Sequence, residues 1–380
     1  MIMRSPCCSN VPQKEPTRRR HFFLMSVLLF LLPAFTAYAA PPTILLGVQA
    51  EPLVDADSVG DGVLPWALEA QGLISFRTLL EETGYLSFLA DLRAGLMFLT
   101  PVAGTDQEQL SLELGFPIGD GKLVGQAFLH SSFQGTIALE RFTIPEWEIR
   151  YFFLDKPGVL NPYLAYTGSV QIQPEESTDH LSQGIMIGCE YQPSYLASYG
   201  LALEASWEHW YESILVTETG TQADDVRNDL LLSLTGTAGG IIGLYLDWDV
   251  TLSVLLRLST ANRYLTLPAV YEGDIENSLQ PLLKARFSWS PSSHLTFEAA
   301  PFVGATVYFT RSALSESGAL RDQTALIVSL GGLFRTSWTP DNLFYLFLEV
   351  NGEKSVVNTA EEDMDASFLR IAFGVKMTLQ

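Results

Sequence analysis

The sequence has few charged residues and lacks any apolar run long enough to form a transmembrane helix. Of its 380 residues, 17% are charged and 47% are hydrophobic, whereas soluble domains carry about a quarter charged residues. The longest nearly pure apolar stretch, 22–32, is shorter than the roughly 18 residues that a spanning helix needs. Scarce basic residues exclude nucleic-acid binding, and 11% aromatics exclude a disordered chain. High hydrophobicity without long runs predicts alternating β-strands that face lipid.

Cysteine is also scarce, and the usual sequence motifs of enzymes are missing. Cys7 and Cys8 lie in an N-terminal segment that we expect to be removed, so Cys189 remains alone and an intramolecular disulfide is excluded. The sequence contains no GxSxG, HExxH or CxxC motif and no phosphate-binding loop. Of the later histidines, only His130 is expected on a polar strand face. We therefore expect no catalytic, cofactor-binding or metal-binding residues.

The first forty residues have the pattern of a secretory signal peptide. Arg18–Arg20 precede the apolar stretch 22–32, and Ala37-Tyr38-Ala39 follows as a small-x-small cleavage site. As a helix, eleven residues rise only about 16 Å, about half the thickness of the hydrocarbon core. The sequence thus predicts a cleaved leader over 1–39 and one domain over 40–380.

Apolar and polar residues alternate with a period of two along most of the domain. Between Ile242 and Leu258, even positions carry Ile, Leu, Val and Trp, while odd positions carry mostly Asp, Thr, Ser and Arg. Successive side chains of a strand point to opposite faces, so such a segment has one apolar and one polar face. The strands of a soluble β-sandwich alternate in the same way, so strand length must distinguish a sandwich from a membrane-spanning sheet. Most segments here have ten or more residues, which suits tilted membrane-spanning strands of about 9–11 residues.

The alternating segments predict sixteen antiparallel strands in one closed transmembrane β-barrel. Their expected ranges are 43–51, 66–77, 84–98, 109–118, 122–131, 146–154, 159–172, 183–192, 199–211, 229–238, 241–258, 280–289, 294–310, 324–338, 343–352 and 366–380. If 43–51 is a plug or linker instead of a strand, the even strand number of such barrels also removes 66–77. Fourteen strands then remain.

The connections between these strands alternate between long and short from end to end. The long gaps are 52–65, 99–108, 132–145, 173–182, 212–228, 259–279, 311–323 and 353–365. Short ones such as Gly119–Gly121 and Asp155–Gly158 carry turn residues, and a further short gap lies at 239–240. Outer-membrane barrels have short periplasmic turns and longer external loops. We therefore expect both ends of the domain on the periplasmic side.

Several phrases of the sequence resemble those of the outer-membrane β-barrel superfamily of diderm bacteria. Arg150–Leu154 followed by Asn161–Gly168 resembles an "RYYF…PYLGAG" hairpin, and Gly184–Tyr191 is similar to a "GxGxGxEY" strand. The last strand resembles a signal for the barrel assembly machinery, although it ends in Gln380 rather than in an aromatic residue. The resemblance implies a porin-like barrel in the outer membrane and does not point to a subfamily.

On strand parity, charged residues of both signs fall on the polar face, where acids outnumber bases. The residues that we expect to line the lumen include Asp91, Arg93, Glu146, Glu148, Arg150, Asp247, Asp249, Arg257, Lys284 and Arg286. These charges either pair with one another or bias a pore toward cations. In a filled lumen, we expect Asp247 and Asp249 to pair with Arg257. Rings expected near strand ends or on the lipid face, as aromatic girdles, are Trp66, Trp147, Tyr151, Tyr163, Trp207, Trp289 and Trp338.

Three functions fit this pattern. The first is a porin-like channel for passive diffusion of small hydrophilic solutes, with a mild cation preference. The second is a plugged or closed barrel that serves as a surface scaffold or adhesin through its loops. The third is a transporter of hydrophobic compounds. The expected partners are outer-membrane lipid, the assembly machinery at the last strand and further copies of the chain in a homo-oligomer, and nucleic acid is excluded.

Overall fold

The computed structural model describes residues 43–52, 54–55, 66–80, 84–98, 105–134, 142–172, 179–194, 196–267, 269–340, 344–360 and 367–379. The expected leader, 1–39, lies outside these residues. For the strands up to residue 109, the structure describes the backbone alone. No helix among the described residues is long and apolar enough to cross a membrane.

The described chain is an all-β antiparallel structure, as expected. Its strands are β1 (Thr43–Pro52), β2 (Val54–Asp55), β3 (Trp66–Leu80), β4 (Gly84–Phe98), β5 (Thr105–Ile118), β6 (Gly121–Gln134), β7 (Phe142–Phe152), β8 (Leu160–Gln171), β9 (His180–Ser194), β10 (Ala197–Val216), β11 (Gln222–Ile242), β12 (Leu246–Ser259), β13 (Arg263–Leu265), β14 (Val270–Glu272), β15 (Ser278–Ser292), β16 (Leu295–Leu314), β17 (Leu320–Trp338), β18 (Phe344–Val357) and β19 (Ser367–Leu379).

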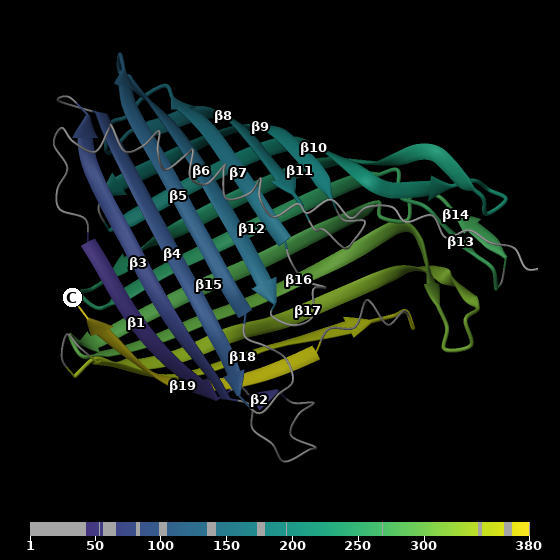
Figure 1. Ribbon diagram of the computed structural model, residues 1–380. Helices are drawn as coiled ribbons and strands as arrows, with labels where there is room; N and C mark the ends of the chain where they lie inside the picture. Colours follow the sequence, from purple (N-terminus) through teal and green to yellow (C-terminus); the bar gives the residue numbers. More distant parts are fainter. Residues whose placement is uncertain are drawn as a thin grey trace, which may run out of the picture. The chain divides into compact units, whose positions relative to one another are not determined.

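Neighbouring strands along the chain pair with one another, so the sheet is a continuous meander (Figure 1). The main sheet has 17 strands, and β13 and β14 form a separate pair between β12 and β15. β1 pairs with β3 along one edge and with β19 along the other, where Leu46 lies opposite Leu379. The short β2 also pairs with β19.

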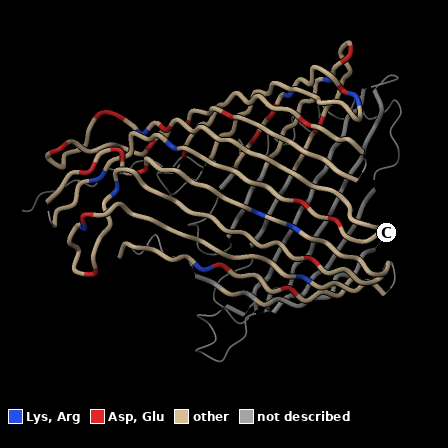
Figure 2. Tube along the Cα trace, turned by 180° about the vertical axis from the view of Figure 1, so that it is seen from behind, with Lys and Arg blue, Asp and Glu red and all other residues tan. Residues whose placement is uncertain are grey.

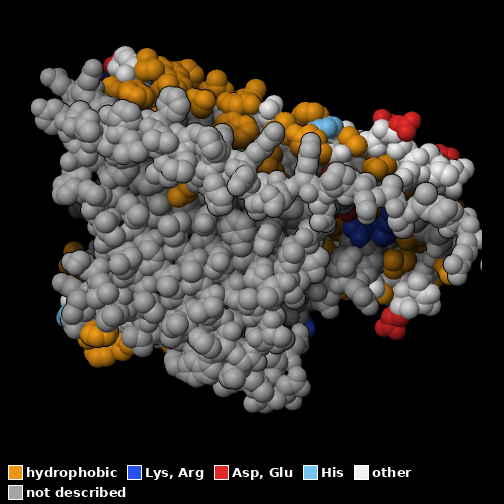
Figure 3. All heavy atoms as spheres, viewed as in Figure 1, with side chains coloured by type: hydrophobic (Ala, Val, Ile, Leu, Met, Phe, Trp, Pro, Cys, Tyr) orange, Lys and Arg blue, Asp and Glu red, His pale blue; other side chains and the backbone are white. Residues whose placement is uncertain are grey.

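The alternation read from the sequence gives the sheet two chemically different faces. Leu164, Ile187, Leu203 and Leu234 are successive cross-strand partners on β8 to β11, and 45%, 53%, 49% and 47% of their surfaces are exposed. Figure 3 shows hydrophobic side chains along the edge of the molecule where β8 to β10 lie in Figure 1. The adjacent residues of these strands form a row on the other face that is mostly small or polar and includes one methionine: Ala165, Met186, Glu204 and Ser233.

Few described residues are fully buried, and no central hydrophobic core joins them. A small apolar cluster lies near one end of β16 to β18, where Tyr308 and Ala325 pack against Ile327 and Val357. Stability of the sheet therefore comes mainly from the backbone ladder, in which each inner strand bonds on both sides.

Two of the expected long loops are largely extensions of strands. Residues 212–228 and 311–323 were expected to be loops, but the β10–β11 and β16–β17 hairpins continue to turns at 217–221 and 315–319. The amide of Thr217 donates to Thr221 O at 2.7 Å, and Gly220 has a φ of 79°, which favours glycine. Charged residues such as Asp224 and Asp225 hid these extensions because they interrupt the apolar alternation.

The expected turn at 239–240 is wrong, since both glycines lie within β11. The turn lies at 243–245, where Gly243 has a φ of 66°. A Cβ on Gly240 would lie 2.1 Å from Leu196 O. The glycine at 240 therefore permits a close backbone approach and does not make the turn.

The expected loop 259–279, of which residue 268 lies outside the described residues, contains a short hairpin of its own. It runs from the end of β12 through the β13–β14 pair to the start of β15. Figure 2 shows Lys, Arg, Asp and Glu gathered at the end of the sheet that carries β13 and β14.

Candidate functional site: the polar face of the sheet

Of the residues expected to line the lumen, Asp91 and Arg93 lie on β4, where only the backbone is described. Their Cα partners on β5 are Gln109 and Gln107. The two residues are therefore on the same face of the strand, as their spacing in the sequence predicted.

Glu148 and Arg150 on β7 form an ion-paired group with β9. Arg150 Nε lies 2.7 Å from a carboxylate oxygen of Glu148, and Nη1 lies 2.9 Å from Glu190. The guanidinium also lies 4.5 Å from the ring centroid of Tyr163 on β8, which is within cation–π range. Glu146 on the same face is exposed. The structure thus joins Glu148 and Arg150 to Glu190 and leaves Glu146 to solvent.

Tyr163 was expected in an aromatic girdle, and this expectation is wrong. Only 6% of its surface is exposed, because its ring packs under Arg150 and across Gly188. Trp207, Trp289 and Trp338 are 45%, 49% and 49% exposed on the apolar face, which fits rings that contact lipid headgroups.

Asp247, Asp249, Lys284 and Arg286 lie on the neighbouring strands β12 and β15, and all four are exposed. Asp249 is the Cα partner of Arg286, but Arg286 Nε bonds Glu298 on β16 at 2.6 Å. Asp247 lies opposite Ser288, and Lys284 lies opposite Thr251. Among the described residues, no ion pair holds Asp247, Asp249 or Lys284, so their charges are available to solvent.

Arg257 lies on the same strand as Asp247 and Asp249, but it does not pair with them. Eight residues separate Arg257 from Asp249, or about 26 Å along a strand. Arg257 instead lies 3.6 Å from Asp229 on β11 and 3.9 Å from Glu208 on β10. The expected pairing of Arg257 with the two aspartates is therefore wrong.

Asp229 is the centre of a buried polar network that the sequence did not reveal. Its side chain has no exposed surface, and Arg227 on the same strand contacts it through two nitrogens, at 2.6 Å and 3.0 Å. The Ser259 hydroxyl donates to the same carboxylate, and Asn277 Oδ1 accepts from the Ser259 amide at 2.6 Å. Asp229 begins the expected strand 229–238, but Arg227 fell in the expected loop 212–228, so the pair was missed.

A second set of ion pairs crosses the polar face from β15 to β18. Arg286 binds Glu298, and Arg335 Nε on β17 donates to Glu349 on β18 at 2.7 Å. Arg335 is the Cα partner of both Glu298 and Glu349. Positive and negative side chains therefore alternate across these strands, as expected if charges of the wall pair with one another.

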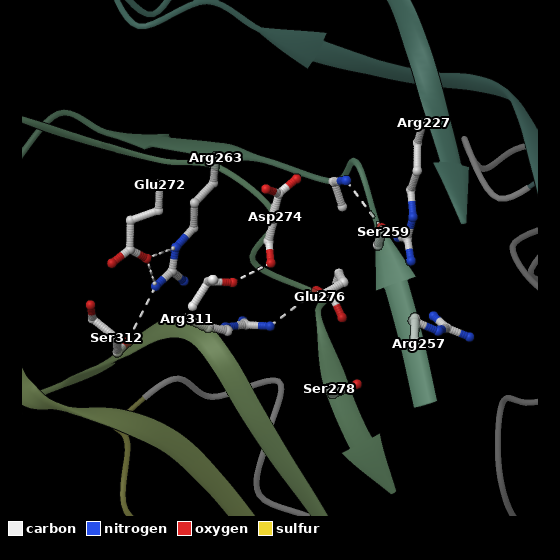
Figure 4. Close-up of polar contacts among 12 residues, drawn as sticks. Arg227, Arg257, Ser259, Arg263, Glu272, Asp274, Glu276, Ser278, Arg311 and Ser312 are labelled. Carbon is white, nitrogen blue, oxygen red and sulfur yellow. Dashed lines mark hydrogen bonds and ion pairs between the residues drawn. The ribbon is translucent and has the colours of Figure 1, made fainter. Parts of the chain in front are cut away.

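The segment between β12 and β15 is fixed by side chains on both of its sides, and Figure 4 shows those that join it to Arg311 and Ser312 on β16. Arg263 binds Glu272 across the β13–β14 pair at 2.8 Å, and Arg311 on β16 binds Glu276 at 3.1 Å. Asn262 bonds both backbone groups of Val216 on β10, accepting at 2.9 Å and donating at 3.0 Å. The segment therefore bridges the β10–β11 and β16–β17 hairpins.

Two hollows open on the polar face, so this face is locally concave. One of about 450 Å³ lies among β7 to β11 and is lined by Arg150, Glu190, Glu204 and Thr235. A smaller one of about 230 Å³ adjoins it around Glu146 and Glu148. The described residues contain no cluster of three His, Cys, Asp or Glu that could hold a metal ion.

The chain shares its fold with a bacterial outer-membrane protein of known structure. OmpT of Vibrio cholerae, in its in-vitro folded trimer form, matches with a TM-score of 0.50 and 8% identity over 90% of this chain and 100% of OmpT. OccD3 of Pseudomonas aeruginosa matches with a TM-score of 0.49 and 9% identity over 91% of this chain and 93% of OccD3. No protein-family model and no curated protein matches the chain.

At 8% identity, the likeness to OmpT shows a shared fold and says nothing about the activity of this chain. The resemblance to outer-membrane barrels that the sequence suggested is confirmed at that level: an all-β antiparallel meander without helices among the described residues.

Proposed function

We propose that residues 40–380 form a closed sixteen-stranded barrel in the outer membrane, after removal of a leader over 1–39. The pairing of β1 with both β3 and β19 supports closure, because it leaves neither strand as a free edge. Counting around the sheet from β1 through β3 to β19, and omitting the short β2, β13 and β14, gives the proposed sixteen.

We further propose that the barrel is a porin-like channel for small hydrophilic solutes. The observation that carries this function is the polar face, which is hollowed and bears hydroxyls and charges on β7 to β18. The opposite face is apolar and exposed, as a surface in contact with lipid would be. A barrel of this size leaves an aqueous interior unless a segment fills it.

The mild cation preference that we propose rests on which wall charges lack an ion-pair partner. Glu148, Glu298 and Glu349 each neutralise an arginine. Asp247 and Asp249 on β12 have no ion-pair partner among the described residues. On the neighbouring strand β15, Lys284 is the one cation without an ion-pair partner among those residues. Unpaired carboxylates attract cations more strongly than paired ones, because a paired charge is largely cancelled nearby.

Reversal potentials in a planar bilayer test the channel and its selectivity together. In a KCl gradient, the wild-type protein should conduct and favour K⁺. Asp247→Asn combined with Asp249→Asn should move the reversal potential toward that of an unselective pore. Conductance should change less than selectivity, since the substitution removes charge and no volume.

The matched control is Asp224→Asn combined with Asp225→Asn, which removes the same charge from exposed positions near the β10–β11 turn. It should leave the reversal potential nearly unchanged. A wild-type protein that is folded but shows no conductance contradicts the channel and supports the filled barrel as a surface scaffold. Equal shifts in both variants contradict the role of the wall aspartates.

The proposed partners follow from the same arrangement. The apolar face would contact outer-membrane lipid, with Trp207, Trp289 and Trp338 near the headgroups. We propose that β19, whose sequence resembles an assembly signal, is the strand that the barrel assembly machinery engages.

A further inference from the structure

We propose that the larger hollow, between β7 and β11, binds a small solute that carries a protonated amine. The hollow is about 450 Å³ in volume, within the range of small-molecule sites. This inference rests on the proposed function for one step, since the solute would reach the hollow through the channel. It adds the chemical class of one solute and the residues that recognise it.

Small and hydroxyl-bearing residues line the middle of the hollow: Gly200, Ala202, Thr235 and Thr237. Cross-strand partners on β9, β10 and β11 form two neighbouring rows, one through Gly188, Ala202 and Thr235 and the next through Glu190, Gly200 and Thr237. A Cβ on Gly200 would lie 2.5 Å from Thr237 Oγ1, and one on Gly188 would lie 2.5 Å from the Tyr163 ring. The Tyr163 ring thus covers Gly188, and the depression lies over Gly200 and Ala202, between the longer side chains of Glu190 and Glu204.

One wall of the hollow is a line of hydroxyl groups on β11. Ser233, Thr235 and Thr237 occupy alternate positions and all line the hollow. Spacing by two residues puts neighbouring hydroxyls about 7 Å apart along the strand. Each hydroxyl can accept a hydrogen bond from an N–H or O–H group of a solute.

The charges around the hollow favour a cation. Arg150 is bound by both Glu148 and Glu190, which together outweigh its positive charge. Glu204 accepts from the Thr167 hydroxyl through Oε1 at 2.8 Å, and its other oxygen has no hydrogen-bond partner among the described residues. Carboxylates beside acceptor hydroxyls suit an ammonium group, which offers three N–H donors.

Binding of ethanolamine to the refolded full-length mature chain in detergent micelles tests the inference. Calorimetry should detect ethanolamine, which is cationic at pH 7, and ethylene glycol, its neutral analogue, should bind at least tenfold more weakly. Glu204→Gln should weaken ethanolamine binding about tenfold, since it removes a charge-assisted bond. Thr235→Val should weaken it a few-fold, and Ala202→Leu should abolish it by filling the hollow without changing charge.

The matched control is Glu353→Gln, which removes a carboxylate from β18, a strand that does not line the hollow. This variant should bind ethanolamine as the wild type does. Equal binding of ethanolamine and ethylene glycol, or equal weakening by Glu353→Gln and Glu204→Gln, would overturn the proposal. Circular dichroism of each variant identifies any that has failed to fold, and Thr235→Val then serves in its place.

The experiment separates this inference from the channel itself. A protein that conducts in the bilayer but does not bind ethanolamine refutes the amine site and leaves the channel intact. A protein that binds ethanolamine in micelles but does not conduct refutes the channel and leaves the amine site intact.

Discussion

Asp229 is a carboxylate without any exposed surface, and such a group is tolerated only where its charge is fully paired. Arg227 supplies two contacts, Ser259 supplies a hydroxyl, and Arg257 lies 3.6 Å away. The cost of burying the charge is therefore offset by several hydrogen bonds to the charged form. The same arrangement fixes β11 to the end of β12.

We expect Asp229→Asn to destabilise the folded protein strongly. The substitution leaves two arginines near a neutral amide, and breaking a buried pair by removing one partner costs about 3–5 kcal/mol. Unfolding by guanidinium in micelles, followed by tryptophan fluorescence, measures the change. The exposed Asp225→Asn should cost less than about 0.5 kcal/mol, and a similar small effect of Asp229→Asn would show that the pair contributes little.

For single residues, the sequence predicted which face of the sheet a side chain lies on, but not which residue it contacts. Strand parity assigned Glu148, Arg150 and Arg286 to one polar face, and their side chains do contact other residues of that face. It did not predict that Arg286 binds Glu298 or that Arg257 turns to Asp229. Partner choice depends on the register between strands, which hairpin turns set residue by residue and which alternation alone does not encode.

Among the elements, the segment 260–277 is joined to neighbouring strands by side-chain bonds as well as by backbone bonds. The Asn262 side chain joins it to Val216 through two bonds to the backbone and also donates to the Tyr271 hydroxyl at 3.1 Å. These bonds connect a short hairpin to a strand that lies more than forty residues earlier in the chain. Without them, the segment would keep its connection to β16 through Arg311 and Glu276.

We expect Asn262→Ala to increase trypsin cleavage after Arg263 in the folded protein. Loss of a part-buried hydrogen-bonding group costs about 1–3 kcal/mol, so the locally open population should rise roughly fivefold or more. Cleavage is measured by mass spectrometry of the native protein in micelles. Asn161→Ala, which removes a similar amide that bonds the backbone of Lys156, is the control and should not change cleavage at Arg263.

The sequence predicted the strands well because apolar and polar residues alternate through the middle of each strand. Their ends were predicted less well: β10 and β11 were each expected to be shorter, since charged residues near the turn hide the pattern. Gly239 and Gly240 were placed in a turn because they fell in the short gap between two alternating segments, 229–238 and 241–258. Only the backbone contact with Leu196 O explains why glycine is needed there instead.

For the whole molecule, the proposed closure of the sheet depends on the pairing of β1 with β19, which we call the seam. Gly47 and Thr378 are Cα partners in this seam, and directly opposite residues lie within the span of a disulfide. In a Cys189→Ala background, Gly47→Cys with Thr378→Cys should therefore cross-link on oxidation of the refolded protein. The cross-link should speed migration of the denatured chain in a non-reducing gel.

Two further pairs calibrate this result. Leu203→Cys with Leu234→Cys, which are partners in the β10–β11 hairpin, should also cross-link. Gly47→Cys with Leu330→Cys, on strands that do not pair, should not. A seam that stays reduced while the hairpin pair oxidises would contradict the closed barrel.

Orientation in the membrane is a second property of the whole molecule. In the same Cys189→Ala background, Ser317→Cys in the turn 315–319 should react with a large, membrane-impermeant maleimide on intact cells. Asp120→Cys, in a short turn, should react only after the outer membrane is opened. The reverse pattern would invert the proposed topology. Asn262 is unsuitable for such a label because its side chain holds the segment to Val216.

The seam also has a consequence for the order of folding. A hairpin such as β10–β11 joins Leu203 to Leu234, whereas the seam joins Leu46 to Leu379. Closing the roughly tenfold longer loop costs about 2 kcal/mol more chain entropy, because this cost grows with the logarithm of loop length. Each hairpin can thus find its register from local contacts alone. The first and last strands meet at less cost once the strands between them have already paired.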